Sequence, residues 1–394
     1  MGNQRDINQI DPSDNFDEIE PVGKVKGKED QLSQAYWSLV WWKFKKNKLA
    51  IVGALIIFLF YTVCGVFPEF FSPYLLNYQS DYLEARPQPL TFKKPDGSFS
   101  LRPAVKGLDQ ELDLIARQRT WVVNEERIYP ISFFVKGQPY KLLGFIPSNI
   151  HFFGIDTEKY PEGTAFLFGT DRVGRDLLSR ILYGGRLSLL LGLIGQALTL
   201  ILGLVLGAIS GYYGGVVDII VQRLTEFVGA FPDIPLFMAL AAAIPIKWSP
   251  IIVYFMLTLI LVFIRWGGLA RQVRGLILSL REREYVLAAL SSGANARRIM
   301  FRHLIPGTIS HVIVIATLMI PSMILSETAL SWLGLGLRPP LTSWGVLLQE
   351  VSSVRAIRFA PWQLITVPFI IVVVLGFNML GDGLRDALDP YGGR

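Results

Sequence analysis

Long stretches without charged side chains dominate the hydrophobic pattern of this chain. Four stretches carry no charge, and two more carry one acid each, Asp233 and Glu327. The six stretches are 49–67, 187–217, 227–246, 249–264, 311–337 and 359–381. A helix needs about 17–25 residues to cross the hydrocarbon core of a bilayer. The pattern therefore predicts an all-α polytopic membrane protein with six spans, because a helix satisfies its own backbone hydrogen bonds in lipid.

Composition supports this prediction and removes several others. The chain is 51% hydrophobic, which is too apolar for an ordinary soluble protein. Cys64 is the single cysteine, so a disulfide framework is excluded. The residues before Cys64 make a poor lipobox, and the polar segment upstream is too long for a cleaved signal peptide. We therefore expect 49–71 to be a retained first transmembrane helix.

Basic residues predict which side of the membrane each segment occupies. Tryptophans and lysines form a collar between Trp37 and Lys48, at the end of the 1–48 tail. The loop 267–310 is rich in arginine, as cytoplasmic loops are. We expect both termini, 1–48 and 387–394, in the cytoplasm, with the protein in the inner membrane. The net charge of +6 follows from this topology and does not require nucleic acid as a partner.

The segment 72–185 differs in character from the spans around it. Pro-Asp-Gly at 95–97 is a turn sequence between two short stretches that alternate as strands do. A charged segment, 124–127, separates two further apolar stretches and predicts another turn. We expect a small β-rich extracytoplasmic insertion, and the alternative is a packed loop without regular structure.

Small residues recur every four positions in the second predicted span, at Gly195, Thr199, Gly203, Gly207 and Gly211. This spacing places them along one edge of a helix. Small residues on such an edge let a second helix approach closely in lipid. We expect a tightly packed bundle over 186–386. The plainer explanation is the general frequency of glycine in membrane helices.

A short basic segment, 284–306, lies within the loop 267–310. A first helix is expected to begin at Glu284 and to end at Gly293, where glycine permits a left-handed conformation. A second helix over 296–304 carries Arg297, and Pro306 predicts a turn into the fifth span. These features are equally typical of a docking loop and of an amphipathic helix on anionic lipid.

Side-chain size gives the first of these helices two distinct features. Tyr285, Val286, Ala289 and Leu290 are expected to share one helical face. Ala288 and Ala289 are small enough for the surface of another protein to approach.

The same segment resembles the loop by which the membrane subunits of ABC importers dock on their ATPases. The motif is an Ala-Ala pair, a glycine and a terminal proline, here Ala288-Ala289, Gly293 and Pro306, while Leu287 replaces its glutamate. Other passages resemble the dipeptide, oligopeptide and nickel permease branch, namely 168–176, 211–215, 333–336 and 381–390. The resemblance covers the first span and 166–392, but not the insertion.

This resemblance implies a type I importer permease fold, without catalytic activity, that transports peptides. The partners implied are a homologous second permease, ATPases that use ATP and Mg²⁺, an extracytoplasmic solute-binding protein and membrane lipid. The implied ATPase-coupling residues are Glu284, Tyr285, Ala288, Ala289, Gly293, Arg297 and Pro306. Oligosaccharide or nickel-chelate cargo is the alternative within the family, and a self-contained secondary transporter is the more remote one.

Candidate chemistry elsewhere is sparse. The sequence has no Gly-x-x-x-x-Gly-Lys-Ser/Thr phosphate loop, and its three histidines and one cysteine do not form a metal-ligand pattern. Asp233 lies in a proline-flanked break of the third predicted span. Glu327 lies deep in the fifth, where an ionisable group tends to face a cavity. Glu327 therefore either lines a substrate pathway or is a hydrogen-bonded packing residue.

Overall fold

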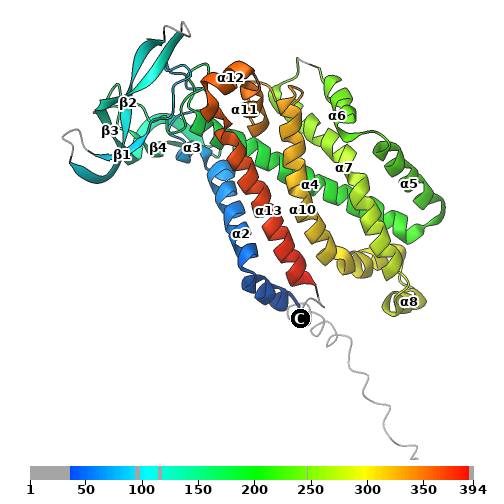
Figure 1. Ribbon diagram of the computed structural model, residues 1–394. Helices are drawn as coiled ribbons and strands as arrows, with labels where there is room; N and C mark the ends of the chain where they lie inside the picture. Colours follow the sequence, from blue (N-terminus) through cyan, green and yellow to red (C-terminus); the bar gives the residue numbers. More distant parts are fainter. Residues whose placement is uncertain (1–35, 94–97, 114–117, 246, 390–394) are drawn as a thin grey trace, which may run out of the picture.

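The computed structural model describes residues 36–93, 98–113, 118–245 and 247–389. This part of the chain forms a helical bundle with a small β-sheet beyond one end of it (Figure 1). Five segments are long and apolar enough to cross a membrane, and a bent helix pair raises the number to six if it forms one span. The predicted polytopic helical fold with a β-rich insertion is confirmed at this level.

The five segments include short π- or 3₁₀-helical parts, labelled η. They are α2 with η1 (Lys48–Phe60 and Tyr61–Val66), α4 (Leu177–Tyr213), α7 (Pro250–Leu280), α9 with η2 and α10 (Ala296–Ile299, Met300–Leu304 and Ile305–Trp332), and η3 with α13 (Pro361–Ile365 and Thr366–Leu388). Short helices at the ends of the bundle are α3 (Pro68–Phe71), α8 (Glu284–Ser291), α11 (Trp344–Val351) and α12 (Val354–Phe359).

The third predicted span is two helices rather than one. α5 (Gly215–Gly229) and α6 (Asp233–Ala242) meet at an angle of 86°. Pro232 lies at the break in an extended conformation, and its ring cannot continue the helical hydrogen bonding of α5. The sequence pattern predicted the break but placed the start of the third span at residue 227. In the structure, the helical segment begins directly after α4, at Gly215.

Close approach of α4 to α7 organises the bundle. A Cβ atom on Gly207 would lie 2.5 Å from the Ala270 carbonyl oxygen. At Gly203 and Gly211 it would lie 2.9 Å from side-chain atoms of α7. Gly195 is different, because a Cβ there would make ordinary contacts with Met323 and Thr258 at 3.4 and 3.5 Å. The tightest glycine contacts of α4 with α7 therefore fall between Gly203 and Gly211, near the end of α4.

A second glycine contact joins the first span to the last. A Cβ atom on Gly53 of α2 would lie 2.6 Å from the Gly376 carbonyl oxygen of α13. One on Gly383 would lie 2.1 Å from the Ala50 Cβ. These glycines do not follow the four-residue spacing of the glycines in α4, so the sequence did not predict this contact. They hold α2 directly against α13, as Figure 1 shows.

The insertion is an antiparallel sheet with the strand order β1-β2-β3-β4. The strands are β1 (Leu90–Lys93), β2 (Phe99–Asp113), β3 (Gln118–Leu142) and β4 (Ile146–Ile155). The first half of β3 pairs with β2, and its second half pairs with β4. The predicted strands on either side of 95–97 are confirmed. The turn itself lies outside the described residues, as do residues 1–35 of the predicted 1–48 tail.

The turn predicted over 124–127 is wrong, because these residues belong to β3. The pairing shifts from Lys106 opposite Ile128 to Gly107 opposite Asn124, so β3 carries a bulge here. The Asn124 side-chain oxygen accepts hydrogen bonds from the backbone N–H groups of Glu126 and Arg127. Such local bonding is typical of turn sequences, which explains the error.

Replacing Gly207 with alanine tests the contact between α4 and α7. The new methyl group would overlap the Ala270 carbonyl, and overpacking of this kind costs about 1–3 kcal/mol. We expect Gly207→Ala to lower the melting temperature of the purified protein in detergent. Gly275→Ala on α7 is the control, because a Cβ there meets open space. A Gly207→Ala protein that melts with the wild type would contradict the described packing.

Candidate functional site

The loop between α7 and α10 folds back on the ends of both helices. Val286 of α8 and Ile299 of α9 are fully buried, and Leu304 of η2 is buried with them. They pack in one cluster with Val273 and Ile277 of α7. The loop therefore has an inner apolar face, and the bundle fixes its position at the end opposite the sheet (Figure 1).

Gly293 ends the first helix of this loop. Its φ is +78°, so the left-handed conformation expected from the sequence is confirmed. The Ala294 N–H donates to the Ala289 carbonyl at 3.0 Å, and the Gly293 N–H donates to the Leu290 carbonyl at 2.9 Å. This pair of bonds is a Schellman motif, which satisfies the last carbonyls of a helix. Asn295 then caps the next helix by accepting from the Arg298 N–H at 2.9 Å.

The outer face of the loop is apolar and basic. Tyr285, Leu287 and Leu290 are nearly half exposed on α8, and Phe301 is 66% exposed. The face predicted to hold Tyr285, Val286, Ala289 and Leu290 is therefore split, with only Val286 buried. Exposed charges beside these residues are Glu284, Arg297, Arg298 and Arg302. Large apolar side chains gathered on one surface are typical of a contact with another molecule.

The turn predicted at Pro306 is wrong, because the helix continues through it. The π-helical segment Met300–Leu304 joins α9 to α10, and Pro306 lies in the first turn of α10. The Ile305 N–H donates to the Met300 carbonyl, five residues back. The missing N–H of a proline and the clash of its ring disturb helical bonding one turn earlier. The wider π turn accommodates that disturbance without a break.

Glu327 is buried between helices and is 3% exposed. The Ser188 hydroxyl of α4 donates to its Oε2 atom at 3.1 Å, and the Ser331 hydroxyl donates to its Oε1 atom at 2.7 Å. Both carboxyl oxygens therefore have partners. The bond from Ser188 joins α4 to α10.

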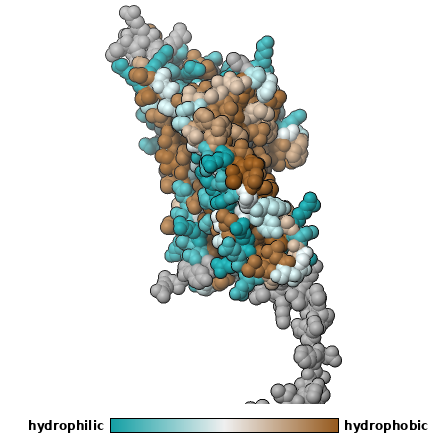
Figure 2. All heavy atoms as spheres, turned by 90° about the vertical axis from the view of Figure 1, so that its right-hand side faces the viewer, coloured by the Kyte–Doolittle hydropathy of each residue, from teal (hydrophilic) through white to brown (hydrophobic). Residues whose placement is uncertain are grey.

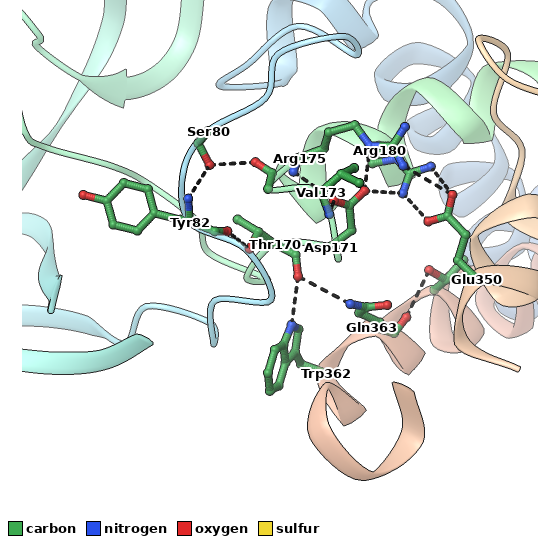
Figure 3. Close-up of polar contacts among 12 residues, drawn as sticks. Ser80, Tyr82, Thr170, Asp171, Val173, Arg175, Arg180, Glu350, Trp362 and Gln363 are labelled. Atoms are coloured by element: carbon green, nitrogen blue, oxygen red, sulfur yellow. Dashed lines mark hydrogen bonds and ion pairs between the residues drawn. The ribbon is translucent and has the colours of Figure 1, made fainter. Parts of the chain in front are cut away.

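A buried polar network lies at the other end of the bundle, where α4 begins (Figure 3). The Asp171 Oδ2 atom accepts from Arg175 and Arg180 at 2.7 Å each, and both arginines also reach Glu350 of α11. Arg180 and Asp171 are almost inaccessible to solvent. Since Arg180 belongs to α4, the network joins α4, its preceding loop and α11.

The same loop also binds the insertion and η3. The Thr170 carbonyl accepts from the Trp362 side chain at 3.3 Å, and its hydroxyl accepts from the Ala85 N–H at 2.8 Å. A Cβ on Gly174 would lie 2.0 Å from the Ser80 carbonyl oxygen, and Gly174 has a φ of +80°. The glycine at position 174 of the sequence passage 168–176 therefore has a structural cause, because only glycine fits where its backbone meets the backbone of Ser80.

Asp176 closes this loop and caps α4. Its side chain accepts from the Ser179 N–H at 2.8 Å and from the Ser179 hydroxyl at 2.6 Å. Burial raises the pKa of Asp176 to about 7, although the hydrogen bonds from Ser179 act in the opposite direction. No group of three or more His, Cys, Asp or Glu residues suited to a metal ion occurs within the described parts of the chain.

Comparison with known proteins agrees with these features. The sequence model of the family 'binding-protein-dependent transport system inner membrane component' matches residues 203–391. The model of the N-terminal TM domain of oligopeptide transport permease C matches residues 35–93. Residues 94–202, with β2, β3 and β4, lie outside both matches.

Curated relatives give the same result. The oligopeptide transport system permease protein OppC of Haemophilus influenzae is 43% identical over 230 residues, which cover 58% of this chain and 71% of that protein. The dipeptide transport system permease protein DppC of Alkalihalophilus pseudofirmus is 42% identical over 224 residues, which cover 57% of this chain and 71% of that protein.

The fold and these matches define a multi-pass helical membrane protein of the transport permease class. The chain belongs to the family of binding-protein-dependent transport system inner membrane components. The resemblance seen in the sequence is confirmed.

Sequence reasoning missed the partners in the polar network. Arg180 and Glu350 are 170 positions apart, and neither lies in a motif with its partner. It also missed Arg265, which directly follows the uncharged stretch 249–264 and forms an ion pair with Asp233 at 3.3 Å. The signal that could have identified Arg265 is a single arginine directly after a long apolar stretch.

Replacing Glu350 tests the network. Glu350→Ala leaves two arginines, one of them buried, to share Asp171. Loss of one partner of a buried ion pair costs about 3–5 kcal/mol. We expect a lower melting temperature and faster proteolysis of the insertion. Glu125→Ala is the control, since its pair with Lys106 is solvent-exposed and should contribute little. Equal behaviour of the two variants would contradict a structural role for the network.

Proposed function

We propose that this chain is the permease subunit of an ATP-driven importer that carries di- or oligopeptides across the cytoplasmic membrane. The observation that carries the proposal is the similarity, at about 40% identity, to permeases of oligopeptide and dipeptide transport systems. The multi-pass helical fold and the exposed apolar residues Tyr285, Leu287 and Leu290 at one end, here called the docking surface, support it. The relatives' names favour peptides over oligosaccharide or nickel-chelate cargo, and over a self-contained secondary transporter.

The loop between α7 and α10, which lies within the predicted cytoplasmic segment 267–310, is the proposed contact with a separate ATPase. Its inner face is fixed to α7 and α10 through Val286, Ile299 and Leu304, so force on the loop reaches both helices. Its outer face exposes Tyr285, Leu287 and Leu290 to a partner. Ala288 and Ala289 are the small residues near which the partner surface approaches, and Gly293 sets the angle between the two halves. In this proposal, ATP and Mg²⁺ bind to the ATPase and not to this chain.

The remaining partners follow from the family. A homologous second permease would complete the pathway, and a solute-binding protein would deliver cargo on the side of the insertion. The lysine collar and the arginine-rich loop support an orientation with 267–310 and both termini in the cytoplasm. In that orientation 72–185 is extracytoplasmic. We assign Glu327 to packing within the bundle, because its two oxygens are occupied by serine hydroxyls.

Gly293→Val tests the coupling role of the loop. A Cβ there meets open space, so the effect comes from the left-handed backbone, which costs a β-branched residue roughly 1–2 kcal/mol. We expect an intact bundle with weaker ATPase co-purification and less peptide-stimulated ATP hydrolysis in proteoliposomes. Ala289→Trp should have the same effect by holding the ATPase away.

Gly144→Val is the matched control for this test. Gly144 also has a positive φ, +84°, and open space at its Cβ, but it lies in the tight turn between β3 and β4. It should leave ATPase association unchanged. If the loop instead lies on lipid, replacing Arg297 and Arg298 by glutamine would abolish activity while Gly293→Val and Ala289→Trp behaved as wild type. That outcome would reject the coupling proposal.

Single cysteines test the orientation. On a Cys64→Ser background, an impermeant thiol reagent should label Leu101→Cys in intact cells, because Leu101 is 88% exposed on the insertion. It should label Ser291→Cys, at the end of α8, only after the membrane is opened. Labelling in the reverse order would overturn the orientation and place the proposed ATPase contact outside.

A further inference from the structure

Arg265 is the middle residue of α7 (Pro250–Leu280). At about 1.5 Å per residue, each end of the helix is more than 20 Å away along its axis. Arg265 directly follows the uncharged stretch 249–264, so it lies at the end of the apolar part of this helix, where a charged side chain usually faces the bundle interior or a polar cavity. Its neighbours therefore indicate what it does.

Arg265 lines a groove of about 380 Å³ between α6, α7 and α10. This volume is within the range of small-ligand sites, which run from roughly 300 to 1,000 Å³. The walls are largely apolar, and the polar groups are Arg265, Asp233, Ser322 and Ser326. The break between α5 and α6 brings Asp233 to this position, because α6 begins there. Figure 2 shows the side of the bundle that carries α5, where hydrophilic atoms interrupt a broad hydrophobic surface.

The ion pair in the groove is loose. Arg265 Nη1 lies 3.3 Å from an Asp233 oxygen, and Nη2 donates to the Ser326 hydroxyl at 3.0 Å. The Arg265 Nε atom is buried and has no hydrogen-bond partner within the part of the chain that the structure describes. The Asp233 side chain is 55% exposed. The pair therefore retains both a spare donor and accessible acceptor oxygens.

A second ion pair, between Arg274 of α7 and Asp218 of α5, has a tighter geometry. Arg274 donates to both carboxylate oxygens of Asp218 at 2.5 Å, and Ser210 donates to the same carboxylate. That geometry is bidentate and leaves little for another ligand to gain. We therefore assign a structural role to Arg274, whereas Arg265 can still bind a further ligand.

We propose that Arg265 and Asp233 form a transit site for the charged ends of a peptide. The peptide carboxylate takes the place of Asp233 on the Arg265 guanidinium, whose planar donors match a carboxylate. The peptide ammonium group binds Asp233. When the site is empty, the two side chains neutralise each other, so no unpaired charge is left in the groove. Ser322 and Ser326 supply hydroxyls beside the site. This inference rests on the proposed peptide-import function.

The test uses the complete reconstituted importer with its own solute-binding protein. Alanine peptides of two to five residues are supplied in three forms, with free termini, with an amidated C-terminus and with an acetylated N-terminus. Each variant is compared with wild type on the same peptide, so the selectivity of the binding protein cancels. A bond to a charged group contributes about 1.5–3 kcal/mol, equivalent to roughly tenfold or more in rate.

We expect Arg265→Gln to reduce uptake of the free peptide about tenfold, but to reduce uptake of the amidated peptide far less. Asp233→Asn should also reduce uptake of the free peptide, but reduce uptake of the acetylated peptide far less. Arg265→Lys should retain part of the uptake that Arg265→Gln loses. Arg223→Gln is the matched control, because Arg223 of α5 forms an exposed pair with Glu226 outside the groove. It should match wild type on all three peptides.

Equal losses on all three peptides would show that the pair is only structural and would overturn the inference. Wild-type uptake in Arg265→Gln would also overturn it. In both cases peptide import itself would stand, since wild type still transports. A wild-type complex that takes up none of the alanine peptides would instead reject the proposed function, and the inference with it. ATPase co-purification with each variant confirms that the complex has assembled.

Discussion

The contact between α4 and α7 is the interaction on which the rest of the structure depends. Gly203, Gly207 and Gly211 let the two helices meet at backbone distance. In lipid this closeness matters, because dispersion contacts between helices replace the hydrophobic effect as the driving force. Ile277, which faces Gly211, also packs against Val286 of the loop. The glycine contact therefore positions the proposed docking surface as well as the bundle.

Four charged side chains within the helical bundle have different kinds of partners, and the differences carry functional information. Glu327 is enclosed by serine hydroxyls, and Arg274 is matched to one carboxylate by two bonds. Arg180 is surrounded by acids from two segments. The carboxylates and the terminal guanidinium nitrogens of these groups have partners, which is typical of structural roles, although the Arg180 Nε atom is also buried without a partner in the described residues. Only Arg265, of these four, combines a loose pair with a buried unpartnered donor atom.

The loop 169–176 is one of the contacts that join the insertion to the bundle, beside the aromatic contacts of Phe70 and Phe71 of α3 with Phe152 of the sheet. Ala85 and Ser80 bond to this loop from the insertion side, and Trp362 bonds to it from the bundle. Because the loop leads into α4, a load on the insertion reaches the same helix that packs against α7. The two ends of the molecule are thus connected through α4.

The sequence alone determined the apolar spans, the break at Pro232 and the left-handed turn at Gly293, because each depends on local composition or on one residue's backbone freedom. It misled at 124–127 and at Pro306, where pairing with β2 and a π-helical segment overrode local signals. The meetings of Arg265 with Asp233 and of Arg180 with Glu350 were decided only by the tertiary structure. Such partners are distant in sequence, and only helix packing places one charge opposite another.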